Sequence, residues 1–111
     1  MPQHEWVKDF PGAVTVCDAQ GIIIEMNDKA RQTFGPDKEL VGKSVFDCHP
    51  EPARTKLREL LVTGRTNAYT IEKKGVHKLI YQAPWYRDGS IAGLVELSFE
   101  IPAALRHFVR T

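Results

Sequence analysis

Residues 76–101, VHKLIYQAPWYRDGSIAGLVELSFEI, contain the pattern that decides the fold. Asp88-Gly89 interrupts two β-prone runs, as expected of a tight turn between antiparallel strands. One face of the second run, residues 90–101, carries Ile91, Val95, Leu97, Phe99 and Ile101, and the other carries Ser90, Glu96, Ser98 and Glu100. Such alternation is typical of an antiparallel strand that is buried on one side.

The first run, residues 76–86, predicts a matching apolar face of Leu79, Tyr81, Ala83 and Trp85, with His77 at the same parity. A third strand is expected at residues 66–73, before a turn at Lys74-Gly75. The last third of the chain therefore predicts three neighbouring antiparallel strands.

Short helices and one longer helix are expected between these strands and an earlier hairpin. The hairpin joins residues 13–18 and 22–26 through Ala19-Gln20-Gly21. Asn27 then resembles the N-cap of a short helix that ends near Gly35. From Pro50 to Gly64 the apolar side chains follow a helical period, with Ala53, Leu57, Leu60 and Leu61 on one face. This order predicts an α+β domain with a single sheet covered on one face by helices.

Both ends of the chain carry amphipathic segments. Residues 4–10 predict a short N-terminal helix that presents Trp6, Val7 and Phe10. Residues 102–110 predict a C-terminal exit helix with Leu105, Phe108 and Val109 on one face.

Length and charge limit the function classes. The chain has 111 residues, so residues 1–111 are expected to form one domain. Lys and Arg number 15 against 14 Asp and Glu, a net charge of +1, which does not favour nucleic acid or an anionic membrane as partner. No apolar run approaches the ~20 residues of a membrane span, and the N-terminus lacks the pattern of a signal peptide. We expect a cytoplasmic protein whose two cysteines are free.

The order of several short motifs resembles the PAS family. The motifs are Gly21 in the first hairpin, Asn27 with Ala30 and Phe34-Gly35, Leu40-Val41-Gly42-Lys43, Thr63-Gly64, and Asp88-Gly89 followed by Gly93. The resemblance covers about residues 11–101. It implies a sensor fold with a five-stranded antiparallel sheet in the order 2-1-5-4-3, short helices and one longer helix on one face, and a cavity between the sheet and that helix.

The resemblance also implies what such a domain does. PAS modules bind haem, flavin, small metabolites or nothing in the cavity, and commonly form homodimers through the outer sheet face and an N-terminal helix. Trp6, Val7 and Phe10 would then be dimer contacts, and the last strand with its exit helix would pass the signal on. With no phosphate loop, zinc spacing or catalytic triad in the sequence, we do not expect an enzyme.

The stretch Asp47-Cys48-His49-Pro50-Glu51-Pro52 allows three interpretations. It resembles the start of a helix, with capping and proline sterics explaining most of its residues. Neutral imidazole is a good iron ligand, so His49 is a haem candidate. A thiol just before a helix N-terminus favours thiolate, so Cys48 is a redox candidate. Covalent flavin chemistry is not expected, because Val45 stands where the resemblance would require cysteine. A faint similarity to PAS modules attached to hemerythrin-type domains assigns no ligand.

Five polar or aromatic residues of the last strands are the candidates for a ligand pocket: Asn67, Tyr69, His77, Tyr81 and Trp85. A few polar groups among apolar walls would orient a small molecule, although packing alone also accounts for the aromatic residues. The sequence thus predicts a sensory PAS module that binds a small molecule or mediates dimer contacts. A haem sensor, a thiol switch and a ligand-free scaffold are the alternatives.

Overall fold

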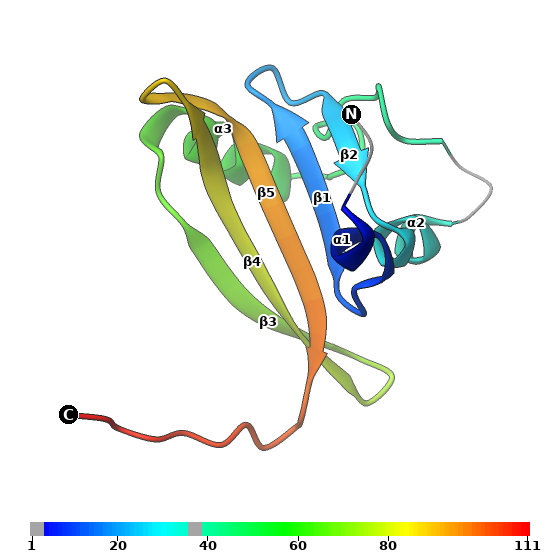
Figure 1. Cartoon of the computed structure of the whole chain (residues 1–111), viewed down its shortest axis with the longest axis vertical. Coiled ribbons are helices and arrows are strands. Elements are labelled where there is room, and N and C mark those ends of the chain that lie inside the picture. The colour runs from blue at the N-terminus through cyan, green and yellow to red at the C-terminus, as the bar shows by residue number, and fades with distance from the viewer. Residues whose placement is uncertain (1–3, 36–38) are drawn as a thin grey trace.

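The computed structural model describes residues 4–35 and 39–111 (Figure 1). Its elements follow in the order α1 (Glu5–Asp9), β1 (Ala13–Asp18), β2 (Ile23–Met26), α2 (Asp28–Phe34), α3 (Ala53–Thr63), β3 (Asn67–Lys73), β4 (Val76–Arg87) and β5 (Ser90–Ile101). The five strands form one antiparallel sheet in the order β2-β1-β5-β4-β3, so the predicted fold class and strand order are confirmed.

The sheet is held together around β5. This strand pairs with β1, where Glu96 faces Thr15, and with β4, where Glu96 faces Gln82. The β4–β5 turn adopts positive φ angles at Asp88 and Gly89, as the Asp-Gly sequence predicts. The sheet therefore joins the two halves of the chain through its last strand.

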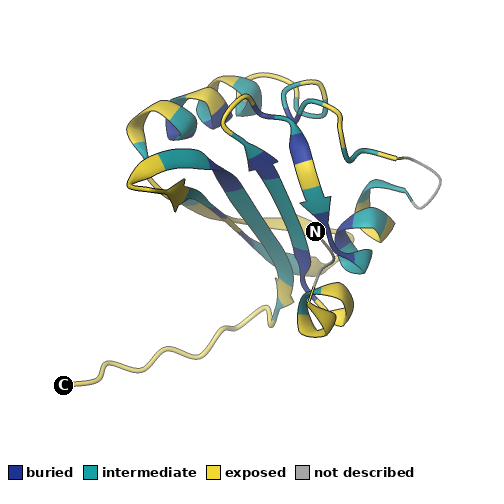
Figure 2. Cartoon of the chain, turned by 45° about the horizontal axis from the view of Figure 1, so that its top comes forward, coloured by how far each residue is buried: buried dark blue, intermediate teal, exposed yellow. Residues whose placement is uncertain are grey.

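The longer helix lies on one side of the sheet, behind the upper part of β4 and β5 in Figure 1. Leu57 and Leu60 are its buried side chains, and Figure 2 shows its other side exposed. Gly64 ends it in the left-handed conformation that glycine adopts most easily. Among the described residues, no helix is long and apolar enough to cross a membrane.

The side of the sheet that the helices cover differs from the sequence expectation. Asn67, Gln82 and Glu96 point toward α3, and we call this side the inner face. Leu79, Tyr81, Leu97 and Phe99 alternate with them and form the outer face. The more apolar side of β5 is thus turned away from the helices, and the polar side chains of the inner face bond to one another.

The expected C-terminal helix over residues 102–110 is not present. Residues 102–111 have no helical structure, and Figure 2 shows this tail exposed along its length. Leu105, Phe108 and Val109 are 59%, 60% and 83% exposed. A short isolated helix is marginal in water, and here the apolar side chains have no surface against which a helix would be stabilised.

Asn27 joins the N-terminal elements. Its Oδ1 accepts hydrogen bonds from the backbone N–H of Val14 (2.9 Å) and of Ala30 (3.1 Å), so it caps α2 as predicted. Its Nδ2 donates to the carbonyl oxygens of Val7 (2.9 Å) and Gly12 (2.8 Å). The side chain is completely buried, and its four hydrogen bonds connect α1, β1 and α2.

We expect Asn27→Ala to lower the free energy of unfolding by about 3 kcal/mol, because buried backbone N–H and C=O groups would lose their partners. Chemical denaturation measures the change. Gln32→Ala, which removes an exposed amide from α2, should change stability by less than about 0.5 kcal/mol. Equal stability of the two variants would contradict the role assigned to Asn27.

Candidate functional site

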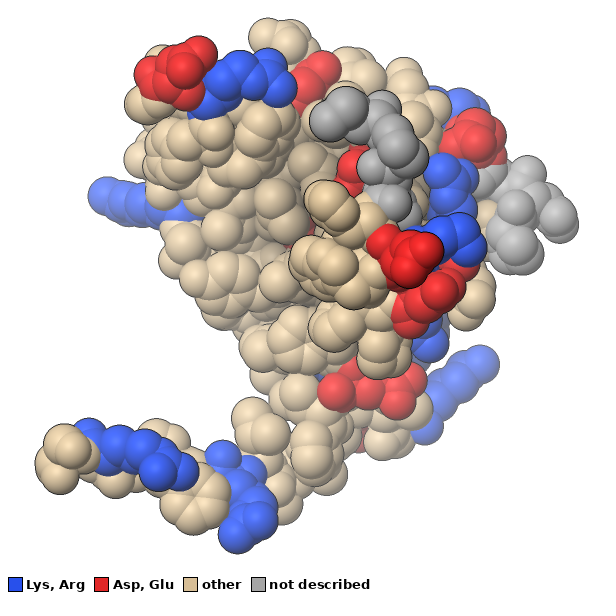
Figure 3. All heavy atoms as spheres, viewed as in Figure 1, with Lys and Arg blue, Asp and Glu red and all other residues tan. Residues whose placement is uncertain are grey.

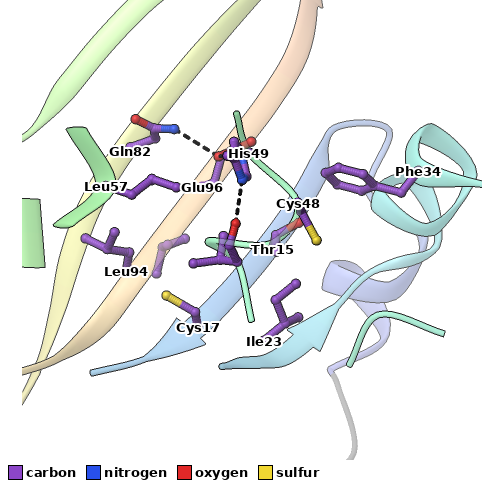
Figure 4. Close-up of a pocket in the computed structure, with 12 residues that line it drawn as sticks. Thr15, Cys17, Ile23, Phe34, Cys48, His49, Leu57, Gln82, Leu94 and Glu96 are labelled. Atoms are coloured by element: carbon purple, nitrogen blue, oxygen red, sulfur yellow. Dashed lines mark hydrogen bonds and ion pairs between the residues drawn. The ribbon is translucent and has the colours of Figure 1, made fainter. Parts of the chain in front are cut away.

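A small cavity lies between α3, the segment 45–49 and the inner face. Its volume is about 20 Å³, which is room for roughly one water molecule. Figure 4 shows Cys17 of β1, Cys48, His49, Leu57 of α3, and Gln82, Leu94 and Glu96 of the sheet among its lining residues. We call this space the core cavity.

His49 has a defined orientation at this cavity. Its Nδ1 lies 2.8 Å from the carbonyl oxygen of Val45, so Nδ1 must carry the hydrogen and donate. Its Nε2 therefore faces the cavity, 4.0 Å from Oε2 of Glu96. The imidazole pairs with the inner-face carboxylate only when Nε2 carries a proton as well.

Neither haem nor flavin fits the core cavity. A macrocycle or a fused ring system is many times larger than about 20 Å³. A bare metal ion is a separate case from haem, whose iron needs only one axial imidazole: the residues that the structure describes include no group of three or more His, Cys, Asp or Glu side chains placed to hold such an ion. The core cavity beside His49 has no room for a haem, and His49 as a haem ligand stays a prediction from the sequence.

A chain of side-chain hydrogen bonds crosses the inner face. Gln82 Nε2 donates to Glu96 Oε2 at 2.9 Å, and Asn67 Nδ2 donates to Gln82 Oε1 at 2.9 Å. Gln82 is only 4% exposed. The three residues come from β5, β4 and β3, so we call them the amide relay.

The far end of the amide relay opens into a larger depression between α3 and β3. This α3 cleft has a volume of about 470 Å³, within the usual range of about 300–1,000 Å³ for ligand pockets. It is lined by Pro52, Ala53, Thr55, Lys56, Glu59, Asn67, Tyr69 and Gln82. Burial, and secondly the nearby Glu96 carboxylate, raise the pKa of the Tyr69 hydroxyl, so it is neutral at pH 7.

The structure divides the five predicted pocket residues between the two faces of the sheet. Asn67 and Tyr69 line the α3 cleft. His77, Tyr81 and Trp85 stand at alternate positions and lie on the outer face. The five side chains therefore cannot form one wall, since a strand's side chains alternate between its two faces.

Two of these outer residues have structural partners. Trp85 donates a 3.0 Å hydrogen bond from Nε1 to the carbonyl oxygen of Cys17. Gly93 lies beneath the indole, where a Cβ atom would collide with both of these groups. His77 Nε2 lies 3.3 Å from Oε1 of Glu72 on β3.

The two cysteines differ in their surroundings. Cys48 precedes the first residue of α3 by five positions, and a helix dipole acts only near the first turn, so the expected activation by α3 is absent. Its Sγ lies 3.6 Å from the carbonyl oxygen of Ser44. Cys17 is 3% exposed, and burial raises the pKa of its thiol, which disfavours the thiolate.

Gln82 and Glu96 are functional candidates that the sequence interpretation missed. Both interrupt an apolar strand with a polar side chain. Counting back from the Asp88-Gly89 turn would have suggested that the two residues lie near each other across the hairpin, because a tight turn limits the possible registers. The signal is present, but alternation with an apolar face predicts that the polar face of β5 is solvated.

The outer face and α1 leave apolar side chains uncovered. Tyr81 is 40% exposed, and Trp6 and Phe10 of the N-terminal segment are 69% and 41% exposed. Figure 3 shows a broad uncharged area over β4 and β5, with Lys, Arg, Asp and Glu mainly at its margins. Val7 is half-buried, and its carbonyl oxygen is bonded to Asn27.

Comparison with known proteins identifies similar folds. A family model described as "PAS fold" matches residues 7–104. The PAS domain of Bordetella pertussis BvgS is similar with a TM-score of 0.63 and 19% identity, over 86% of this chain and 81% of that chain. No curated protein matches the chain.

Two further solved structures are longer than the matched region. The sensor region of a sensor histidine kinase gives a TM-score of 0.62 and 17% identity over 79% of this chain and 38% of that chain. The VqmA dimer of Vibrio cholerae gives 0.68 and 17% over 87% of this chain and 49% of that chain. The chain therefore spans less than half of each of these two proteins.

At neutral pH we expect iodoacetamide to modify Cys48 and to spare Cys17, because Cys17 is buried and its raised pKa suppresses the thiolate. Mass spectrometry of the digested protein measures both rates. Unfolding in denaturant should make the two rates similar. A Cys48 rate in the folded protein well above that of the unfolded chain would instead support the thiol-switch alternative.

Proposed function

The chain belongs to the PAS fold family, and on that premise we propose that it is a sensory module of a signal-transduction protein whose α3 cleft binds a small molecule. The observation that carries this proposal is the α3 cleft itself. It combines a ligand-sized volume with polar groups of Asn67, Gln82 and Tyr69 beside the sheet. The alternative of a ligand-free scaffold would not account for this cleft.

A ligand in the cleft would act by population shift. It would touch α3 through Lys56 and the sheet through Asn67, and so would favour one separation of helix and sheet over another. The amide relay connects Asn67 to Glu96 on β5, the strand that leads into the C-terminal segment. A change at the cleft would thus reach the end of the domain through hydrogen-bonded neighbours.

A homodimer through the outer face is the second part of the proposal. The specific observation is the uncharged area over β4 and β5 (Figure 3) together with the exposed Trp6 and Phe10. Burying such side chains against a second copy would be favourable by the hydrophobic effect. The cytoplasmic location, and the lack of nucleic-acid or membrane partners, stay predictions from composition.

A thermal-shift survey of small metabolites tests ligand binding. We expect at least one compound to raise the melting temperature, because a ligand that binds only the folded state stabilises it. Tyr69→Ala should abolish that shift, because the ring lines the cleft. Tyr86→Ala is the matched control: Tyr86 is 56% exposed and is not among the residues that line the cleft. A library without any stabilising compound would favour the scaffold.

Sedimentation over a concentration series tests the dimer. The wild-type chain should associate reversibly, whereas Trp6→Lys and Tyr81→Lys should remain monomeric at the same concentrations, because a charge would be buried in the interface. Val62→Lys, which places the same charge on an 82% exposed position of α3, should associate like the wild type. Equal masses for all four proteins would exclude this interface.

A further inference from the structure

We propose that the α3 cleft selects a ligand that offers an N–H donor, with a protonated amine favoured over a carboxylate. This inference deepens the proposed function and rests on it. It follows from the direction of the hydrogen bonds in the amide relay and from the charges around the cleft.

The Glu96 carboxylate determines the direction of the relay. An ionised carboxylate can only accept hydrogen bonds, so Gln82 must turn its NH₂ group toward Glu96. Gln82 therefore turns its oxygen toward β3, and Asn67 must supply an N–H to that oxygen. The Glu96 carboxylate thus orients the Gln82 amide, and Gln82 orients the Asn67 amide.

The outcome is an acceptor at the cleft. One of the two N–H groups of Asn67 Nδ2 is given to Gln82, and Oδ1 has no hydrogen-bond partner among residues 4–35 and 39–111. Asn67 is half-buried and lines the cleft. At Oδ1 a ligand gains a hydrogen bond if it donates and meets repulsion if it presents a lone pair.

The surrounding charges act in the same direction. Lys56 is the only cation that lines the cleft within the described part of the chain, and its Nζ lies 3.6 Å from Oε1 of Glu59, which lines it too. Glu96 adds a further negative charge behind Gln82. Its field reaches the cleft wall, because it contributes to the raised pKa of Tyr69. The potential near Asn67 and Tyr69 therefore favours a cation.

Benzylamine and benzoate are the probes that test this selectivity. Both compounds carry the same phenyl ring, which would pack against Tyr69. Benzylamine is a cation that donates hydrogen bonds, whereas benzoate is an anion that accepts them. Titrations at pH 7 follow the side-chain ¹H–¹⁵N signals of Asn67 and Gln82. We expect benzylamine to shift these signals and to bind at least about tenfold more tightly than benzoate, the factor of one charge-assisted hydrogen bond.

Three variants separate the relay from general charge effects. Glu96→Gln replaces a group that can only accept by an amide that also donates, so the direction of the relay is no longer forced and the charge is lost; the preference for benzylamine should fall about tenfold. Asn67→Leu should remove benzylamine binding. Glu72→Gln removes the same charge from β3 at a residue that pairs with His77 outside the cleft, and should leave the preference unchanged. The backbone ¹H–¹⁵N spectrum of each variant shows whether the fold is intact.

The outcomes distinguish this inference from the proposed function. Benzoate binding as tightly as benzylamine, a preference that survives Glu96→Gln, or a lack of response at Asn67 and Gln82 to either probe would each overturn the inference. In those cases a stabilising metabolite whose effect is lost in Tyr69→Ala would still support small-molecule sensing. If the metabolite survey also fails, the proposed function falls as well.

Discussion

The buried side chain of Asn27 is the interaction on which the arrangement of this domain depends. One amide satisfies two backbone N–H groups and two carbonyl oxygens that belong to four separate parts of the chain. Without this side chain, the carbonyl oxygen of Val7 in α1 would lose its hydrogen bond to Asn27, and α2 would lose its N-cap. Because buried backbone groups are expensive to leave unpaired, the amide specifies how β1 and its two neighbouring helices meet.

Glu96 has a comparable role on the inner face. The carboxylate is partly buried under α3 and the segment 45–49, where water cannot fully solvate it. Gln82 donates to it, and His49 stands 4.0 Å away. A partly buried carboxylate needs hydrogen-bond donors, and this need orients Gln82 and, through it, Asn67. The polarity of the α3 cleft is therefore a consequence of how the Glu96 charge is stabilised.

The two faces of the sheet consequently have different tasks. The inner face carries the amide relay, the core cavity and the α3 cleft, whereas the outer face carries uncharged side chains around Tyr81 and is joined at its edge by Phe10. Trp85 belongs to the outer face and holds β4 against β1 across Gly93. A ligand and a second copy of the chain would thus act on opposite faces of the same sheet.

The sequence by itself determined the local elements, because their signals are carried by neighbouring residues: the Asp88-Gly89 turn, the Asn27 cap and the end of α3 at Gly64 all lie where the pattern predicted them. The resemblance to the PAS family supplied the strand order. Only the tertiary structure decided which face of β5 lies inward, since alternation with a period of two is symmetric between the faces and does not say where α3 will dock. It divided the five pocket candidates for the same reason, and it left residues 102–110 without helical structure because an amphipathic pattern becomes a stable helix only where its apolar side finds a partner.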